Sequence, residues 1–176
     1  MITLDELLQS RDRRALRQRS LLTQYPGKAL LCLTVQLPGA EKRSALSLEI
    51  ASAAVAAVRG GFSPIFEQLL DLETGYEGYF IVPLSPADAK RRAVALEEEH
   101  PLGRLFDLDV IVPDGGGVRP LSRGELGYGE RRCLVCDKPA RYCIRARSHE
   151  VAELLQVIEE MVQSARSTLA LDKNNG

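Results

Sequence analysis

Two aspartates in an otherwise apolar segment, residues 105–112, constrain this chain more than any other feature. The even positions of the segment are all apolar: Phe106, Leu108, Val110 and Val112. Because side chains alternate between the two faces of a β-strand, Asp107 and Asp109 fall together on the opposite face. Aspartate is depleted in strand interiors, so two neighbouring carboxylates on one face indicate a bound cation. The alternative is an exposed edge strand with two solvated acids.

Length and composition are those of one globular domain. The chain has 176 residues, of which 45% are apolar and 27% are charged. A net charge of −1 favours neither nucleic acid nor a membrane surface as a partner. The charged N-terminus does not resemble a signal peptide, and no apolar run approaches the length of a membrane span. We expect a cytoplasmic protein with one domain at residues 1–171 and a flexible tail at 172–176.

Periodicity and turn residues predict both helices and strands. Thr3 and Glu6 form a capping box that begins a first helix, which ends at Tyr25-Pro26-Gly27. Further helices are expected at 44–59, closed by two glycines, from Ser85 to residue 99, and at 148–171. Strands are expected at 28–37, 77–84 and 105–112, whereas 65–72 suits a strand or a short helix. A flexible turn at 113–117 precedes an irregular loop, rich in Cys and Arg, at 118–147.

The aspartate pair points to phosphate chemistry. Two carboxylates this close raise each other's proton affinity unless a cation neutralises them, and Mg²⁺ favours carboxylate, water and phosphate oxygens. Just upstream, Gly103 and Arg104 supply a tight backbone and a guanidinium that can hold phosphate. The pattern therefore favours metal-dependent phosphoryl or nucleotidyl transfer. A third carboxylate ligand would come from one of four residues, among which the sequence does not choose: Glu97, Glu98, Asp114 and Glu125.

Three of the four cysteines cluster near one of the two histidines. Cys133 and Cys136 form a Cys-x-x-Cys pair, and Cys143 and His149 follow. Three thiols and an imidazole suit tetrahedral Zn²⁺, so zinc is one hypothesis and reduced thiols packed in a loop are the other. A redox role is disfavoured, because this pair does not open a helix after a strand. A disulfide scaffold is not expected without an export signal, and Cys32 is expected in the core.

Two basic segments suggest binding surfaces. The first helix carries arginines on one face, and the Cys-rich loop carries six more cations: Arg131, Arg132, Lys138, Arg141, Arg145 and Arg147. Either set suits a phosphate-rich substrate or an acidic protein partner. A solvated surface is the other interpretation of both.

The motifs, taken in order, are specific enough to identify a family. Residues 100–110 (HPLGRLFDLDV), then 131–136 (RRCLVC) and Cys143 through His149, resemble the citrate lyase holo-acyl-carrier-protein synthase family (CitX). Members of this family are apo-citrate lyase phosphoribosyl-dephospho-CoA transferases. The opening residues 7–14 also look like the first helix of that family.

The resemblance implies a reaction. A serine hydroxyl of the citrate lyase acyl carrier subunit (gamma chain) attacks the α-phosphorus of triphosphoribosyl-dephospho-CoA, and pyrophosphate leaves. Asp107 and Asp109 would then hold Mg²⁺, while Arg104 would steady the developing charge. Further substrate-binding candidates are Gly103, His100, Arg131 and Arg132, although His100 suits a structural role at a helix end equally well.

The same resemblance bears on the fold. The Gly-Arg and Asp-x-Asp arrangement also looks like the nucleotidyltransferase superfamily, which implies a single α+β domain with a mixed sheet flanked by helices. A long C-terminal helix would follow the Cys/Arg-rich loop. Two other functions stay open: a different Mg²⁺-dependent nucleotidyltransferase with another acceptor, and a non-catalytic binding module stabilised by zinc.

Overall fold

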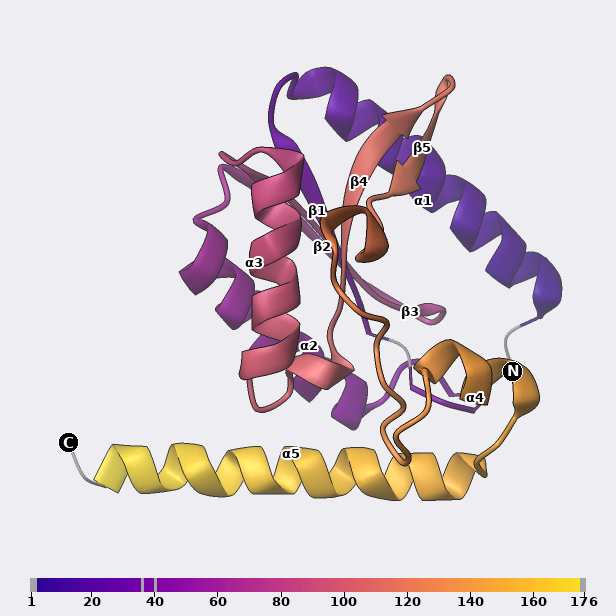
Figure 1. Cartoon of the computed structure of the whole chain (residues 1–176), viewed down its shortest axis with the longest axis vertical. Coiled ribbons are helices and arrows are strands. Elements are labelled where there is room, and N and C mark those ends of the chain that lie inside the picture. Colours follow the sequence, from indigo (N-terminus) through magenta and orange to yellow (C-terminus); the bar gives the residue numbers. More distant parts are fainter. Residues whose placement is uncertain (1–2, 36, 40, 175–176) are drawn as a thin grey trace.

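A five-stranded antiparallel sheet forms the centre of the molecule (Figure 1). The structure is a computed structural model, and it describes residues 3–35, 37–39 and 41–174. The strand order is β2-β3-β1-β4-β5. The strands are β1 (Ala29–Val35), β2 (Phe66–Leu72), β3 (Gly75–Val82), β4 (Asp107–Asp114) and β5 (Gly117–Pro120). The α+β class is confirmed. All strand pairings in the described chain are antiparallel, however, where a mixed sheet was expected. Tight hairpins account for the β2–β3 and β4–β5 pairs, and β1 also runs antiparallel to both of its neighbours, β3 and β4.

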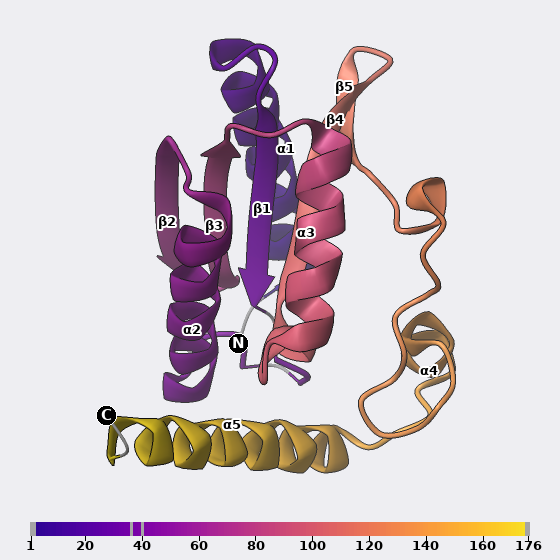
Figure 2. The ribbon, with the colours of Figure 1, turned by 60° about the vertical axis from the view of Figure 1, so that its left-hand side comes forward.

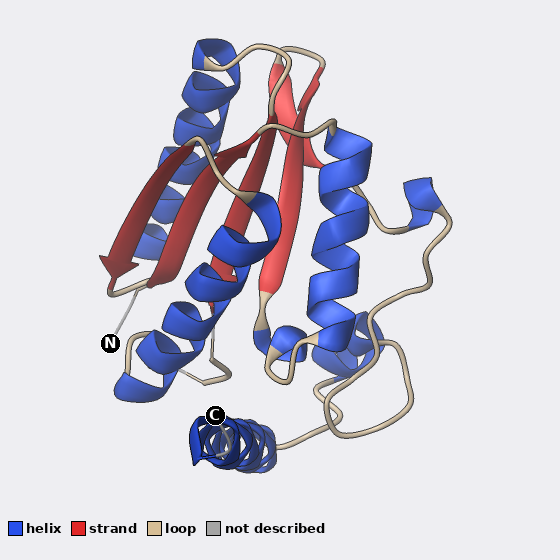
Figure 3. Cartoon of the chain, turned by 90° about the vertical axis from the view of Figure 1, so that its left-hand side faces the viewer, coloured by secondary structure: helices blue, strands red, loops and turns tan. Residues whose placement is uncertain are grey.

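Helices cover both faces of this sheet. Figure 3 shows α1 (Leu4–Gln24) behind the sheet, with α2 (Ala45–Phe62) and α3 (Pro86–Glu99) on the opposite face. The long α5 (Val151–Asn174) crosses the end of the sheet below α2 and α3 (Figure 2). A short 3₁₀ turn, η1 (Gly103–Leu105), leads into β4. The expected single domain with a long C-terminal helix is therefore confirmed.

Local sequence signals place most of the helix ends correctly. The capping box at Thr3 and the N-cap at Ser85 are both present. The predicted stop at Gly60-Gly61 is wrong, because α2 continues to Phe62, whose side chain is buried in the core. It ends instead at Ser63, which adopts the left-handed conformation.

The C-terminal third differs more from the prediction. The loop at 118–147 contains most of β5, the 3₁₀ turn η2 (Gly124–Leu126) and a short helix, α4 (Ala140–Ala146), none of which was expected. The predicted flexible turn at 113–117 is in part the end of β4. The last helix begins at Val151 rather than residue 148 and continues to Asn174, into the segment expected to be a flexible tail.

The core divides into two layers, one on each side of the sheet. The larger layer packs α2, α3 and α5 against inward residues of the strands, including Leu31, Phe80, Leu108 and Val110. The smaller layer packs Leu21 of α1 against the opposite face of the same strands. α2 has the length and apolar composition of a membrane span, contrary to the sequence expectation, but its buried residues form part of the larger layer of the core.

Gly103 sets how closely η1 approaches the end of α3. A Cβ atom placed there would lie 2.4 Å from the carbonyl oxygen of Leu96 and 2.6 Å from that of Glu97. Both neighbours are helix backbone, which cannot move aside without shifting α3. Only glycine therefore allows the chain to enter β4 at this position.

We expect Gly103→Ala to destabilise the protein by about 2–3 kcal/mol, because the new methyl group overlaps backbone atoms. Gly129→Ala is the matched control, since a Cβ atom there meets nothing within 4 Å. Its effect should stay within about 0.5 kcal/mol. Urea unfolding followed by circular dichroism measures both, and equal stability of the two variants would contradict this account of Gly103.

Candidate active site

The two aspartates lie on the sheet face that α1 partly covers. Asp107 pairs across the sheet with Thr34 of β1, which in turn pairs with Glu77 of β3, so the three residues form one row. Asp109 lies in the next row, opposite Cys32. The side chains of Asp107 and Asp109 are 56% and 42% exposed, so both carboxylates can reach a ligand from solvent.

Asp107 is held by groups from two distant parts of the chain. The hydroxyl of Thr34 donates to its Oδ2 at 3.0 Å. A guanidinium nitrogen of Arg131, in the Cys-rich loop, donates to its Oδ1 at 3.3 Å. One carboxylate thus joins the centre of the sheet to the loop.

Asp109 has a different electrostatic environment. Its partial burial raises the pKa of this carboxyl, and the neighbouring charge of Asp107 raises it further. Lys90 of α3 opposes the rise, since its buried ammonium lies 3.8 Å from Oδ1 of Asp109. The pair is therefore a site at which added positive charge is favourable.

Charged side chains also occupy the open edge of β4. β5 pairs only with Ile111–Asp114, so among the described residues no strand lies beside the start of β4 on that side. Arg131 donates to the carbonyl of Phe106, the N–H of Leu108 donates to Glu97, and Lys90 donates to the carbonyl of Leu108. These bonds replace a strand ladder, and they bring three charged groups to the site.

The four candidates for a third carboxylate ligand lie in different surroundings. Glu97 is buried and its charge raises the pKa of Asp109, but its two oxygens accept from Leu108 and Arg123. Glu98 pairs with Arg123 at the surface, and Glu125 pairs with Arg119. Asp114 lies five residues beyond Asp109 on β4, about 17 Å along the strand. None of the four carboxylates points at the pair as an open ligand.

Glu77 is a further carboxylate on this face that the sequence analysis did not single out. It is buried, accepts two hydrogen bonds from Arg14 of α1, at 2.7 and 3.0 Å, and one from the hydroxyl of Tyr79 at 2.5 Å. The pairing gives one arginine of the first helix a structural role. Only the strand register, which involves residues far apart in the chain, could have revealed Glu77.

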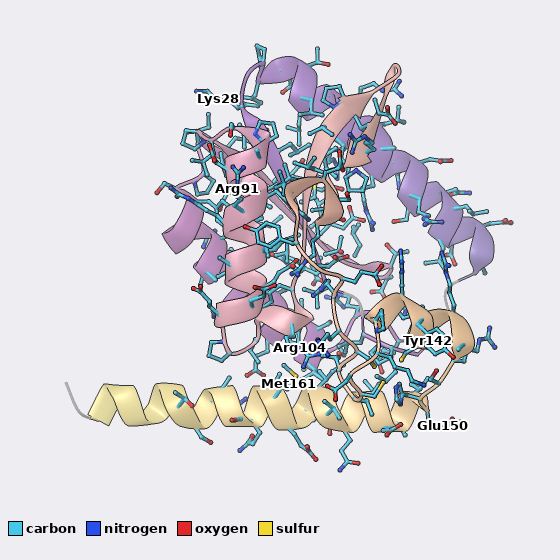
Figure 4. The ribbon with its side chains drawn as sticks, in the orientation of Figure 1. Lys28, Arg91, Arg104, Tyr142, Glu150 and Met161 are labelled. Atoms are coloured by element: carbon cyan, nitrogen blue, oxygen red, sulfur yellow. The ribbon has the colours of Figure 1, made fainter. Side chains whose placement is uncertain are left out.

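Arg104 and His100 engage the protein itself. The guanidinium of Arg104 donates to the carbonyls of Arg132 and Cys133, at 3.3 and 2.5 Å, and so holds the Cys-rich loop. Figure 4 shows Arg104 at the end of the sheet nearest to α5. Nδ1 of His100 accepts from the N–H of Leu102 at 3.0 Å, and partial burial lowers the pKa of His100. The guanidinium beside the aspartates is that of Arg131.

The Cys-rich loop brings its four predicted ligands together. One ligand atom from each of Cys133, Cys136, Cys143 and His149 lies within 4.8 Å of all the others, a Cys3His group that could hold a metal ion. The backbone N–H of Lys138 and the ring of His149 lower the pKa of Cys136 to about 7. Desolvation raises the pKa of Cys143 to about 11.

The remaining cations of this loop are mostly at the surface. Arg141 pairs with Glu130, and the ammonium of Lys138 lies 5.2 Å from the centre of the Tyr142 ring. Arg145 and Arg147 are exposed on and after α4. Their exposure fits both a solvated surface and a binding surface.

Comparison with known proteins gives the family. The family model described as apo-citrate lyase phosphoribosyl-dephospho-CoA transferase (CitX) matches residues 2–165. A probable apo-citrate lyase phosphoribosyl-dephospho-CoA transferase of Streptococcus pyogenes serotype M18 is 39% identical over 93% of this chain and 86% of its own. The Citrobacter koseri protein named apo-citrate lyase phosphoribosyl-dephospho-CoA transferase is 35% identical over 95% and 92%. Protein CitXG of Haemophilus influenzae is 36% identical over 93% of this chain but only 35% of its own.

These matches define the chain first as a transferase. It belongs to the apo-citrate lyase phosphoribosyl-dephospho-CoA transferase family, as its motifs indicated. The matched range contains both the aspartate pair and the whole Cys3His group.

Glu97 and Glu98 offer a test of the charged edge of β4. Both bind Arg123, but Glu97 is buried and also accepts from Leu108, whereas the Glu98 side chain is 58% exposed. We expect Glu97→Ala to cost about 3 kcal/mol of folding free energy, because it leaves buried partners unpaired. Glu98→Ala should cost less than about 1 kcal/mol. Urea unfolding measures the difference, and similar costs would refute the proposed role of Glu97.

Proposed function

We propose that this chain transfers the phosphoribosyl-dephospho-CoA group from triphosphoribosyl-dephospho-CoA to a serine of the acyl carrier subunit of citrate lyase. The serine oxygen forms a bond to the α-phosphorus, and pyrophosphate leaves. The product is the holo-carrier. Family membership supports the proposal, and the observation that carries it is the partly exposed Asp107 and Asp109 pair with Arg131 beside it.

The donor atoms of the pair fit Mg²⁺. Asp107 and Asp109 present carboxylate oxygens on one sheet face, and the repulsion between them is only partly offset by Lys90 and Arg131. When bound, Mg²⁺ supplies positive charge that offsets the triphosphate and the leaving pyrophosphate. Asp107 and Asp109 would hold the ion, and Thr34 fixes one of them in orientation.

Arg131 is the residue best placed to contact the donor. Its guanidinium already reaches Asp107 and two backbone carbonyls, and its side chain is 34% exposed. A guanidinium can bind two phosphate oxygens in a fixed geometry, which would orient the triphosphate for attack. Arg104 was expected to contact the phosphates. We propose instead that it acts indirectly, because its hydrogen bond to the carbonyl of Cys133 holds the Cys-rich loop in place.

The Cys3His group fits a second cation, Zn²⁺. Thiolates and imidazole are ligands that zinc favours, whereas magnesium favours oxygen. Four protein ligands would leave no open position, which is typical of structural rather than catalytic zinc. This ion would therefore take no direct part in the transfer.

We expect Asp107→Asn and Asp109→Asn each to lower the rate of carrier modification by at least about a hundredfold, the scale on which loss of one electrostatic contact to a transition state acts. Asp114→Asn is the control on the same strand and should keep the wild-type rate. The measurement is the intact mass of apo-carrier after incubation with the donor and each protein. Undiminished modification by either site variant would exclude its assigned role.

Modification of the carrier should also depend on added Mg²⁺. Protein freed of loosely bound cations should show no transfer, and activity should rise with millimolar Mg²⁺ because the carboxylates hold the ion weakly through oxygen. Added Zn²⁺ should not substitute. Full activity in a metal-free buffer would contradict the magnesium assignment while leaving the transfer itself intact.

A further inference from the structure

The segment that follows β4 has almost no hydrophobic core of its own. Within residues 115–157, all of which the structure describes, Cys133 and Cys143 are the only buried residues. The apolar side chains on α4 point outward instead, with Ile144 76% exposed and Tyr142 53% exposed. Ordering so long a segment costs conformational entropy that apolar burial does not offset here. The two buried cysteines are therefore the place in this segment where a further source of stabilisation would act.

The cysteines and the histidine have the spacing of a metal centre. All four ligand atoms lie within 4.8 Å of one another, and Sγ of Cys136 is 3.5 Å from Sγ of Cys143. Zinc–sulfur bonds of about 2.3 Å in a tetrahedron place two sulfurs about 3.8 Å apart. The observed separation therefore needs little adjustment. The ligands come from three pieces of chain: the turn before α4, α4 itself, and the link to α5.

His149 adds an independent observation. Its Nε2 is buried and has no hydrogen-bond partner among the described residues. A buried ring nitrogen without a partner is costly, whereas a metal bond would satisfy it. The other nitrogen, Nδ1, lies 3.4 Å from a carboxylate oxygen of Glu153, the arrangement that orients histidine ligands in metal sites.

The backbone after α4 is shaped to return His149 to the cluster. Arg147 adopts the left-handed conformation, with φ of 48°, and the next N–H, of Ser148, donates to the carbonyl of Cys143. Left-handed backbone is unfavourable for a residue with a side chain. This reversal brings the imidazole back beside the thiol of Cys143.

A short path connects this cluster to the aspartates. Cys133 follows Arg131 by two residues, and its carbonyl accepts the hydrogen bond from Arg104. Arg131 in turn donates to the carbonyls of Arg104 and Phe106 and to Asp107. The backbone at Cys133 and the guanidinium of Arg131 are thus held by one connected set of hydrogen bonds.

We infer that Cys133, Cys136, Cys143 and His149 bind one structural Zn²⁺ ion and that this ion holds Arg131 beside Asp107. Arg131 contacts Asp107 directly. The zinc centre, whose first ligand Cys133 lies two residues after Arg131, positions this arginine. The metal-binding half of the inference stands on the cluster alone. The effect on transfer rests on the proposed function.

A disulfide is the competing use of these thiols. A bond between Cys136 and Cys143 would occupy two of the cluster's sulfurs and leave Cys133 and His149 without a partner. The zinc centre satisfies all four residues at once, which is why we favour it.

Metal analysis of the purified full-length chain tests the centre directly. We expect one zinc ion per chain in the wild type and in Cys32→Ala. Cys136→Ser should bind less than about a tenth of that amount, because a structural site needs all four ligands. Cys32 is the matched control, since it is the one cysteine outside the cluster. Metal-free wild type with two of its four thiols oxidised would overturn the inference in favour of the disulfide, and zinc retained in Cys136→Ser would overturn the ligand assignment.

Replacement of zinc by Co²⁺ in the wild type covers the case in which Cys136→Ser fails to fold. A tetrahedral site with three thiolates should give strong sulfur-to-cobalt absorption in the near ultraviolet and visible bands of tetrahedral Co²⁺. A spectrum of octahedral Co²⁺ without sulfur bands would overturn the proposed ligand set.

A double-mutant cycle tests the link to Arg131. Arg131→Ala should keep its zinc but lower kcat/KM for carrier modification by about 10–100-fold. Cys136→Ser should lose its zinc, and its kcat/KM should fall by a similar factor. The double variant should be no worse than either single variant, because both remove the same contact. If the double variant instead loses activity by the product of the two single losses, the role of zinc in positioning Arg131 is overturned. If wild type binds zinc but never modifies the carrier, the proposed function fails and the zinc centre stands.

Discussion

The unpaired edge of β4 is the constraint on which the site depends. The start of this strand has buried backbone groups but, in the part of the chain that the structure describes, no neighbouring strand on one side. An unsatisfied buried group costs about 1–3 kcal/mol. Lys90, Glu97 and Arg131 supply the missing bonds from a helix and a loop. Each of these side chains is charged, so the contacts that fix the strand also set the electrostatic field around its two aspartates.

That field explains how a protein can keep two carboxylates side by side. Lys90 of α3 lies beside Asp109 and Arg131 of the Cys-rich loop lies beside Asp107, while Glu97 restores negative charge nearby. This partial compensation of charge makes the carboxylate pair tolerable in the folded protein. A helix residue, a strand residue and a loop residue must all be in place for this balance, so the contacts that stabilise the start of β4 also set the charge around the aspartates.

Local pattern predicted the elements well and the tertiary contacts poorly. Alternation placed both aspartates on one face of β4, and capping signals located α1 and α3. The sequence could not show that Lys90, within a run of three basic residues, is buried, because the neighbouring Arg91 and Arg92 look the same in one dimension. Nor could it show that Glu77 shares a row with Asp107, since strand register depends on residues 30 positions apart in the sequence.

One local signal nevertheless pointed to a tertiary contact. Three glutamates at the C-terminal end of α3 oppose the helix dipole, an arrangement that local interactions do not favour. In the fold, the first of them accepts from the backbone of β4 and from Arg123, and the second shares that arginine. The unfavourable local charge is thus compensated from outside the helix. The compensating partners lie where α3 meets β4, the strand that carries the two aspartates. The locally unfavourable end of α3 therefore marks the place at which distant parts of the chain assemble the site.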